Sequence, residues 1–107
     1  MLHLVDQGVI GLTDLVRLCA SKPAERFGLG GRKGSLRRGA DADIIVLDPS
    51  RPMKISNADQ LSKAGYTVFD GLQVSTSIES VFLRGIELVC QSNVTGQAIG
   101  RVVSASD

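Results

Sequence analysis

The residues whose types and spacing could support chemistry fall in two short stretches, and the first is rich in glycine. It spans residues 28–35 (GLGGRKGS), where bare backbone N–H groups beside two cations can attract a phosphate. A dinucleotide fingerprint would need a glycine where Lys33 stands, and a P-loop would need the order Gly-Lys-Ser rather than Lys33-Gly34-Ser35. Both motifs also follow a strand, whereas this stretch follows a predicted helix. We therefore expect a turn-rich connection here.

The second stretch is Asp41-Ala42-Asp43, which places two carboxylates two residues apart. On a strand they would share one face, where paired carboxylates can hold a metal or act as acid and base. An apolar run follows, however, and Asp side chains commonly accept backbone N–H bonds at such entries. A catalytic zinc or a Ser-His-acid triad needs histidine, and His3 is the only one. We therefore expect structural aspartates, with His3 exposed or packing.

Length and charge exclude several classes of protein. The chain has 107 residues, a formal net charge of +1 and 4% aromatic residues, whereas nucleic-acid-binding domains show clustered excess Lys and Arg. No apolar run approaches the ~20 residues of a membrane helix, and the N-terminus lacks a signal-peptide pattern. We expect a cytoplasmic protein with no nucleic-acid or membrane partner. A complete (β/α)₈ barrel takes about 250 residues and does not fit.

Two further groups of residues, four cations and two cysteines, are expected to have no role in catalysis or binding. The pairs Arg32-Lys33 and Arg37-Arg38 are typical of a solvated face. Cys19 and Cys90 are far apart and form no C-x-x-C motif. Lone thiols of this kind are usually buried small hydrophobic residues.

The elements that must position these residues begin with three short helices within residues 1–28. Apolar residues recur there at the three- and four-residue spacing of one helix face. Thr13 is placed to cap a second helix over residues 14–20. Pro23 suits the first turn of a third helix, and Gly28 suits a left-handed stop after it.

Strands are expected in the remainder, which makes the fold class α+β. Residues 44–47 (IIVL) form an aliphatic run typical of a strand buried on both faces. Residues 80–83 and 87–90 flank a hairpin turn in which Gly85 can supply a positive φ. Weaker elements are expected at residues 35–37 (a short strand), 58–61 (one helical turn capped by Ser56 or Asn57) and 101–103 (a last strand).

An ordered set of short motifs resembles the C-terminal end of the amidohydrolase superfamily. The similar branch is that of the cyclic amidohydrolases, which includes dihydroorotase, allantoinase and dihydropyrimidinase or hydantoinase. The motifs are Ser21-Lys22-Pro23-Ala24, Phe27-Gly28-Leu29, Lys33-Gly34-Ser35-Leu36, residues 39–46 (GADADIIV), Asp48-Pro49, residues 67–71 (TVFDG) and Arg84-Gly85. The residues that we single out as structural motif positions are Pro23, Ala24, Gly28, Lys33, Gly34, Gly39, Asp41, Asp43 and Gly85.

The resemblance implies that the catalytic residues and the small β-sandwich belong to different parts of such proteins. A metal-dependent TIM barrel carries the chemistry, and N-terminal and C-terminal segments together build a small β-sandwich. Residues 1–32 would correspond to helices at the end of the barrel, and residues 33–107 to the C-terminal share of the sandwich. The family's zinc or other divalent metal is held by His, carboxylated Lys and Asp ligands upstream of the matched region. The resemblance therefore implies no catalytic residue, metal ligand or cofactor in this chain.

These implications give one expected function and two alternatives. We expect a C-terminal fragment of an amidohydrolase-like protein, whose parent activity is metal-dependent hydrolysis of cyclic amides, and which is inactive alone. The alternatives are an oligomerisation or partner-binding module, and a non-catalytic piece that complements a separate barrel subunit. Without the N-terminal strands of the sandwich a β edge stays unpaired, so we expect a homo-oligomer formed through that edge. The parent substrate, the branch, and whether the protein is naturally short stay open.

Overall fold

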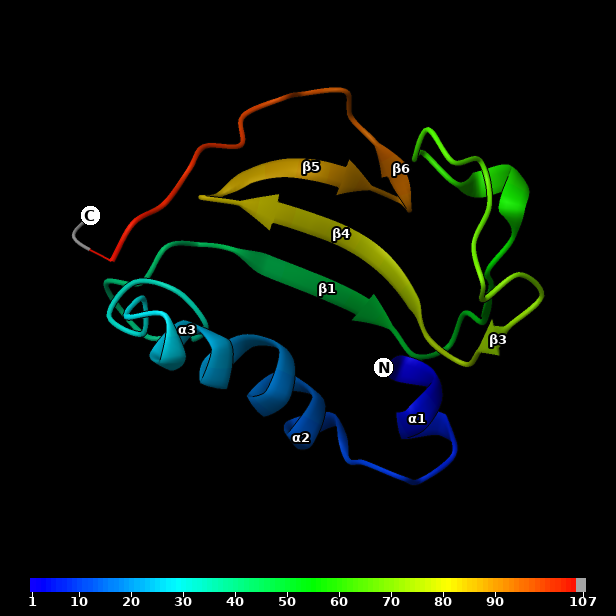
Figure 1. Ribbon diagram of the computed structural model, residues 1–107, viewed down its shortest axis with the longest axis horizontal. Coiled ribbons are helices and arrows are strands. Elements are labelled where there is room, and N and C mark those ends of the chain that lie inside the picture. The colour runs from blue at the N-terminus through cyan, green and yellow to red at the C-terminus, as the bar shows by residue number, and fades with distance from the viewer. Residues whose placement is uncertain (106–107) are drawn as a thin grey trace.

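The computed structural model describes residues 1–105, and its N-terminal part is helical. The helical elements are α1 (Leu2–Asp6), α2 (Leu12–Val16), the π-helical turn η1 (Arg17–Ser21) and α3 (Lys22–Arg26). The last three run on without a break (Figure 1), because the backbone at the junctions keeps helical φ and ψ angles. The prediction of three separate helices was therefore wrong: one short helix precedes one continuous helical arm, which we define as α2-η1-α3.

Two local features explain this difference. The arm begins at Leu12 rather than after Thr13, because the Gly11 N–H donates to Asp14 Oδ2 over 3.2 Å. Pro23 lies in the first turn of α3, as expected, but does not interrupt the arm. A proline ring presses on the carbonyl four residues earlier in a regular α-helix, and the wider π-turn that precedes α3 relieves that contact. Gly28 ends the arm at a φ of +72°, as predicted.

The rest of the chain forms two antiparallel sheets, so the α+β fold class is confirmed. The larger sheet has the order β1 (Ile44–Asp48), β4 (Ser77–Leu83), β5 (Ile86–Cys90), β6 (Asn93–Val94). The smaller sheet pairs β2 (Met53–Lys54) with β3 (Gln73–Val74), and a 3₁₀ turn, η2 (Asn57–Asp59), lies between them in sequence. Val46 of β1 lies opposite Ser80 of β4.

The hairpin predicted around Gly85 is confirmed. Arg84 and Gly85 both have positive φ, +50° and +80°, which is the backbone of a type I′ turn and matches the twist of the flanking strands. A second such pair, Gln91 and Ser92 at +48° and +65°, returns the chain at once to form β6 beside β5.

Two predicted strands are absent from residues 1–105. Residues 35–37 form a loop, because the Arg37 guanidinium turns back to donate to the Gly30 carbonyl over 2.9 Å. Residues 101–103 join no sheet, and β6 is the strand beside β5. The predicted turn near residue 58 is present as η2, with Ser56 as its N-cap.

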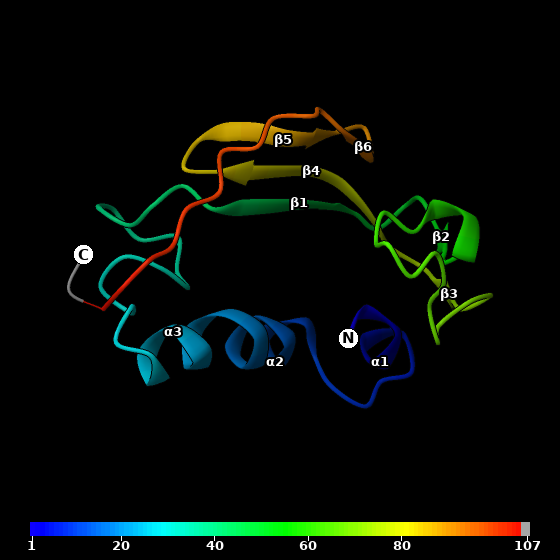
Figure 2. The ribbon, with the colours of Figure 1, turned by 45° about the horizontal axis from the view of Figure 1, so that its top comes forward.

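The helical arm lies on the β1 side of the larger sheet, and the loop that carries Gly34 rests on it. Figures 1 and 2 show α2 and α3 running beyond the β1 side of the sheet, with β2 and β3 at the opposite end from α3. Among the described residues, the buried ones are Ala24, Val74 and Ser77, each at most 7% exposed. The radius of gyration is 15.1 Å, against about 13 Å for a compact domain of this length. The chain therefore leaves much of its apolar surface uncovered.

Two expectations about burial were wrong for this reason. The strand at residues 44–47 is not buried on both faces, since Ile45 is 61% and Val46 41% exposed at the edge of the sheet. Cys19 and Cys90 are free thiols on the surface rather than buried hydrophobic residues.

No helix within residues 1–105 has both the length and the apolar composition that crossing a membrane requires.

Candidate functional site

The motif residues converge on a cluster of charges, which we call the charged clamp and define as Arg32, Lys33, Asp41 and Asp43. Lys33 Nζ lies 2.8 Å from Asp41 Oδ2 and 2.5 Å from Asp43 Oδ2, and its side chain is only 16% exposed. Arg32 Nε lies 3.2 Å from Asp41 Oδ2. The expectation that Arg32 and Lys33 form a solvated face was therefore wrong, because both cations turn toward the Asp-Ala-Asp stretch.

The charged clamp is attached to the sheet through the β4–β5 turn. The Arg84 N–H donates to Asp43 Oδ1 over 2.9 Å, and the Gly85 N–H donates to the Ala42 carbonyl over 2.9 Å. These bonds connect residues more than forty positions apart in sequence. The start of β1 and the tip of the hairpin are thus held together by the same Asp that binds Lys33.

On its other side, the charged clamp is attached to the helical arm through Gly34. A Cβ at this position would lie 2.7 Å from both the Ala20 carbonyl oxygen and Ala24 Cβ, and the φ of Gly34 is +79°. The Ser21 hydroxyl donates to the Gly34 carbonyl over 2.9 Å. Only glycine allows this approach without strain, so the loop rests directly on the buried Ala24.

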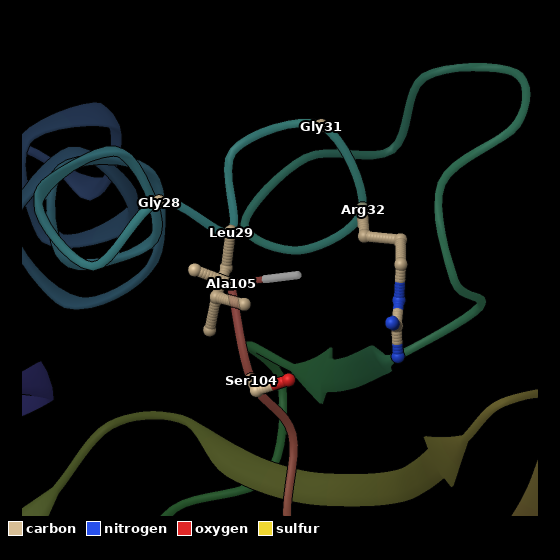
Figure 3. Close-up of a pocket in the computed structure, with 6 residues that line it drawn as sticks. All are labelled: Gly28, Leu29, Gly31, Arg32, Ser104 and Ala105. Carbon is tan, nitrogen blue, oxygen red and sulfur yellow. The ribbon is translucent and has the colours of Figure 1, made fainter. Parts of the chain in front are cut away.

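Other motif positions lie outside these contacts. Gly39 has a φ of +89° with open space around the position of a Cβ, so it serves the turn alone. Gly28 lies beside Ala105, which approaches it from the C-terminal segment. Gly28 and Ala105 line a shallow hollow of about 220 Å³ (Figure 3). Its other lining residues are Leu29, Gly31, Arg32 and Ser104.

The hollow and the glycine loop are not organised as a phosphate cradle. The N–H groups of Arg32 and Lys33 both donate to the Leu29 carbonyl, and the Leu29 N–H donates to the Ala24 carbonyl. The Arg32 guanidinium is paired with Asp41. Since these donors are already used within the chain, the loop is a turn-rich connection, as the spacing predicted.

The ionisation of the charged clamp follows from these contacts. The hydrogen bond from Lys33 lowers the pKa of Asp41. Burial alone would raise the pKa of Asp43, but the bonds from Lys33 and from the Arg84 N–H outweigh it and leave that pKa lowered. Burial would likewise lower the pKa of Lys33, but its two carboxylate partners raise it. All three groups are therefore charged around neutral pH, and none is poised for acid-base catalysis.

The divalent metal implied by the family resemblance does not fit the residues present. Such a site needs several His, Cys, Asp or Glu ligands with unoccupied lone pairs. No group of three or more of these residues comes together within residues 1–105, and the two clamp aspartates are each held by cations. His3 lies half-buried on α1, where its neighbour Asp6 accepts the Ser75 N–H over 2.8 Å.

A second polar cluster escaped the sequence analysis. The Arg51 guanidinium donates to Ser77 Oγ over 3.0 Å, to Glu79 Oε2 over 2.5 Å and to Ser92 Oγ over 3.0 Å. These partners lie 26 to 41 residues away, so no local motif indicates them. The cluster holds the loop that follows β1 against β4 and against the β5–β6 turn. Its side chains, like those of the charged clamp, therefore stabilise the fold.

The pKa shifts of the charged clamp predict an acid-sensitive fold. Carboxyl groups whose pKa is lowered in the folded state stabilise it fully above about pH 4, and that stabilisation is lost as the pH falls through the folded-state pKa. Lys33, with a raised pKa, contributes fully below about pH 10 and loses its contribution as the pH rises further. In Lys33→Met the free energy of unfolding is expected to fall less steeply than in the wild type as the pH is lowered. Urea titrations at several pH values measure this dependence.

Lys22→Met is the matched control, because Lys22 and Glu25 form an ion pair in which both side chains are more than half exposed. Such a pair contributes little, so this variant should keep the acid dependence of the wild type. If the free energy of unfolding of Lys33→Met fell with decreasing pH as steeply as that of the wild type, the charged clamp would not set the pH dependence of stability.

The sequence that builds this fold is similar to that of a known protein family over most of its length. The sequence pattern of the amidohydrolase family matches residues 6–75. D-hydantoinase of Ralstonia pickettii is 34% identical over 93 residues, which cover 87% of this chain and 20% of that protein. D-hydantoinase of Streptomyces coelicolor is 34% identical over 98 residues, which cover 91% of this chain and 21% of that protein. The chain belongs to the amidohydrolase family.

The structure agrees with the sequence. The crystal structure of dihydropyrimidinase from Brevibacillus agri matches with a TM-score of 0.81 at 32% identity, over 87% of this chain and 20% of that one. These relatives lie in the cyclic amidohydrolase branch, which confirms the resemblance inferred from the motifs. This chain spans about a fifth of the length of the relatives that it matches.

Proposed function

We propose that the chain is a non-catalytic C-terminal segment of a hydantoinase-like amidohydrolase, inactive alone. In this proposal, metal-dependent hydrolysis of a cyclic amide is carried out by residues that this chain does not supply. Residues 1–32 correspond to helices at the end of the barrel, and residues 33–107 to the C-terminal share of a β-sandwich. The cytoplasmic location expected from the sequence stays a prediction.

One observation carries this proposal. The similarity extends over nearly all of the chain but over only a fifth of each relative, and the motif residues within it are engaged in structural contacts. Asp41 and Asp43 neutralise Lys33, Gly34 seats the loop on the helical arm, and Gly85 turns the hairpin. These contacts support a structural role for the chain beside a catalytic unit.

An activity assay tests the proposal. The purified chain is incubated with hydantoin and with a dihydropyrimidine, in the presence of zinc, manganese or cobalt. We expect no hydrolysis above the rate of the metal ion alone, while a full-length D-hydantoinase assayed in parallel turns over. Hydrolysis that depends on the chain and is abolished by a chelator would refute the proposal.

A second candidate function is the complementation of a separate barrel subunit, and the exposed helical arm favours it. Leu12 and Val16 are about half exposed, and Phe27 is 72% exposed, so this surface is suited to packing against another protein. The same assay distinguishes the two candidates. Activity that appears only when the chain is co-expressed with a hydantoinase lacking the matching segment would support complementation.

A further inference from the structure

We propose that residues 96–105 form a strap that Arg84 holds in place, and that the strap and the charged clamp open and close together. The strap leaves β6 at one end of the larger sheet and ends beside the loop that follows α3 (Figures 1 and 2). The inference assigns a conformational device to the fold and goes beyond the proposed structural role of the chain.

The first step in the argument is that the strap is held at separate points rather than along its length. Gly96 and Gly100 have open space around the positions of their Cβ atoms, and Val102 is 95% exposed. Ile99 is only partly exposed, and its carbonyl accepts a hydrogen bond from the Arg84 guanidinium over 2.6 Å. Exposed segments of this kind open locally while the rest of a protein stays folded.

The second step is the far end of the strap, which lies against the glycine-rich loop of residues 28–35. Ala105 Cβ is 3.1 Å from the position that a Cβ on Gly28 would take. Ser104 and Ala105 form one wall of the shallow hollow, and Arg32 of the charged clamp forms another (Figure 3). The strap therefore closes over a hollow that the charged clamp helps to build.

The third step is that Arg84 serves the strap and the charged clamp at once. Its backbone N–H donates to Asp43 Oδ1 over 2.9 Å, while its guanidinium donates to the Ile99 carbonyl. These contacts and the hollow connect the clamp, Arg84, the strap and the glycine-rich loop in a closed ring. Because coupling between two sites is reciprocal, opening the clamp should loosen the strap, and releasing the strap should loosen the clamp.

Tryptic cleavage after Arg101 tests the role of Arg84, because Arg101 lies within the strap. Arg84→Met, made in the full chain, removes the guanidinium but keeps the backbone N–H that binds Asp43. We expect cleavage at Arg101, followed by mass spectrometry, to be about tenfold faster than in the wild type. Cleavage of a transiently opened segment follows the population of its open form, and a hydrogen bond from a charged group changes such a population by about this factor.

Two controls separate opening of the strap from other effects. Arg38→Met removes an exposed arginine of the loop before β1 and should leave the rate at Arg101 unchanged. Cleavage after Lys54, in the same digests, reports opening elsewhere in the chain. Lys54 is paired with Gln73 in the smaller sheet, at the opposite end of the molecule from the end of the strap (Figure 2).

Asp43→Ala tests the coupling, because Asp43 belongs to the charged clamp and is connected to the strap through Arg84. We expect the ratio of cleavage at Arg101 to cleavage at Lys54 to rise about fivefold, a usual size for such coupling. Asp59→Ala should leave this ratio unchanged.

Two results would overturn the proposal. A wild-type ratio in Arg84→Met would show that Arg84 does not hold the strap. Equal ratios in Asp43→Ala and Asp59→Ala would show that the strap and the charged clamp open independently. Neither readout involves hydrolysis of a cyclic amide, so the proposed function and the strap can fail separately.

Discussion

Gly34→Ala is expected to lower the free energy of unfolding by about 2–5 kcal/mol. A left-handed backbone costs a residue with a Cβ about 1–2 kcal/mol, and forcing extra volume into a packed contact costs about 1–3 kcal/mol more. Both costs apply at Gly34, because its φ is +79° and a Cβ would lie 2.7 Å from a backbone oxygen of the helical arm. Urea denaturation followed by circular dichroism measures the change.

Gly65→Ala is the control that separates these two costs. Gly65 has a similar φ of +69°, but nothing lies within 4 Å of the position of its Cβ. This variant should lose only the backbone contribution of about 1–2 kcal/mol. If Gly34→Ala were no more destabilising than Gly65→Ala, the loop would not be seated on the arm as described.

Asp43→Ala is expected to cost about 1–2 kcal/mol, a value that allows for the 32% exposure of its side chain. The substitution removes one of the two carboxylates around Lys33 and leaves the Arg84 N–H without its acceptor. Asp43→Asn should cost less, because its amide oxygen can still accept from that N–H. Chemical denaturation of the two variants at neutral pH provides the comparison.

Asp59→Ala supplies the reference for a locally bonded aspartate. Its carboxylate accepts the Ser56 hydroxyl three residues away, and surface substitutions of this kind usually change stability by less than about 0.5 kcal/mol. Equal effects of Asp43→Ala and Asp59→Ala would show that Asp43 does not connect the arm to the sheet.

The parts of the fold that the sequence predicts are those set by local chemistry. The Arg84-Gly85 turn, the stop at Gly28 and the strand at residues 44–47 each have a signal within a few residues, and all three are present. The family was likewise predictable, because its motifs lie in a fixed order along the chain. The continuous helical arm was missed, because Pro23 normally ends a helix and no local sequence signal indicates a π-turn before it.

The contacts of the candidate site were less predictable, since they join distant residues. Nothing near Lys33 in sequence indicates that it lies between Asp41 and Asp43, and composition alone favoured a solvated cation. The exposure of Cys19 and Ile45 was missed for a different reason. Residue type predicts burial when a chain covers its own apolar surface, and this chain leaves its arm and one sheet edge uncovered.

A metal-binding measurement tests most directly whether this chain supplies a scaffold and no hydrolytic metal centre. The purified chain is dialysed against zinc, manganese or cobalt, and the metal bound per chain is determined by mass spectrometry and by calorimetric titration. We expect only substoichiometric, weak binding, because residues 1–105 bring no three ligands together. One tightly bound divalent ion per chain would contradict the account.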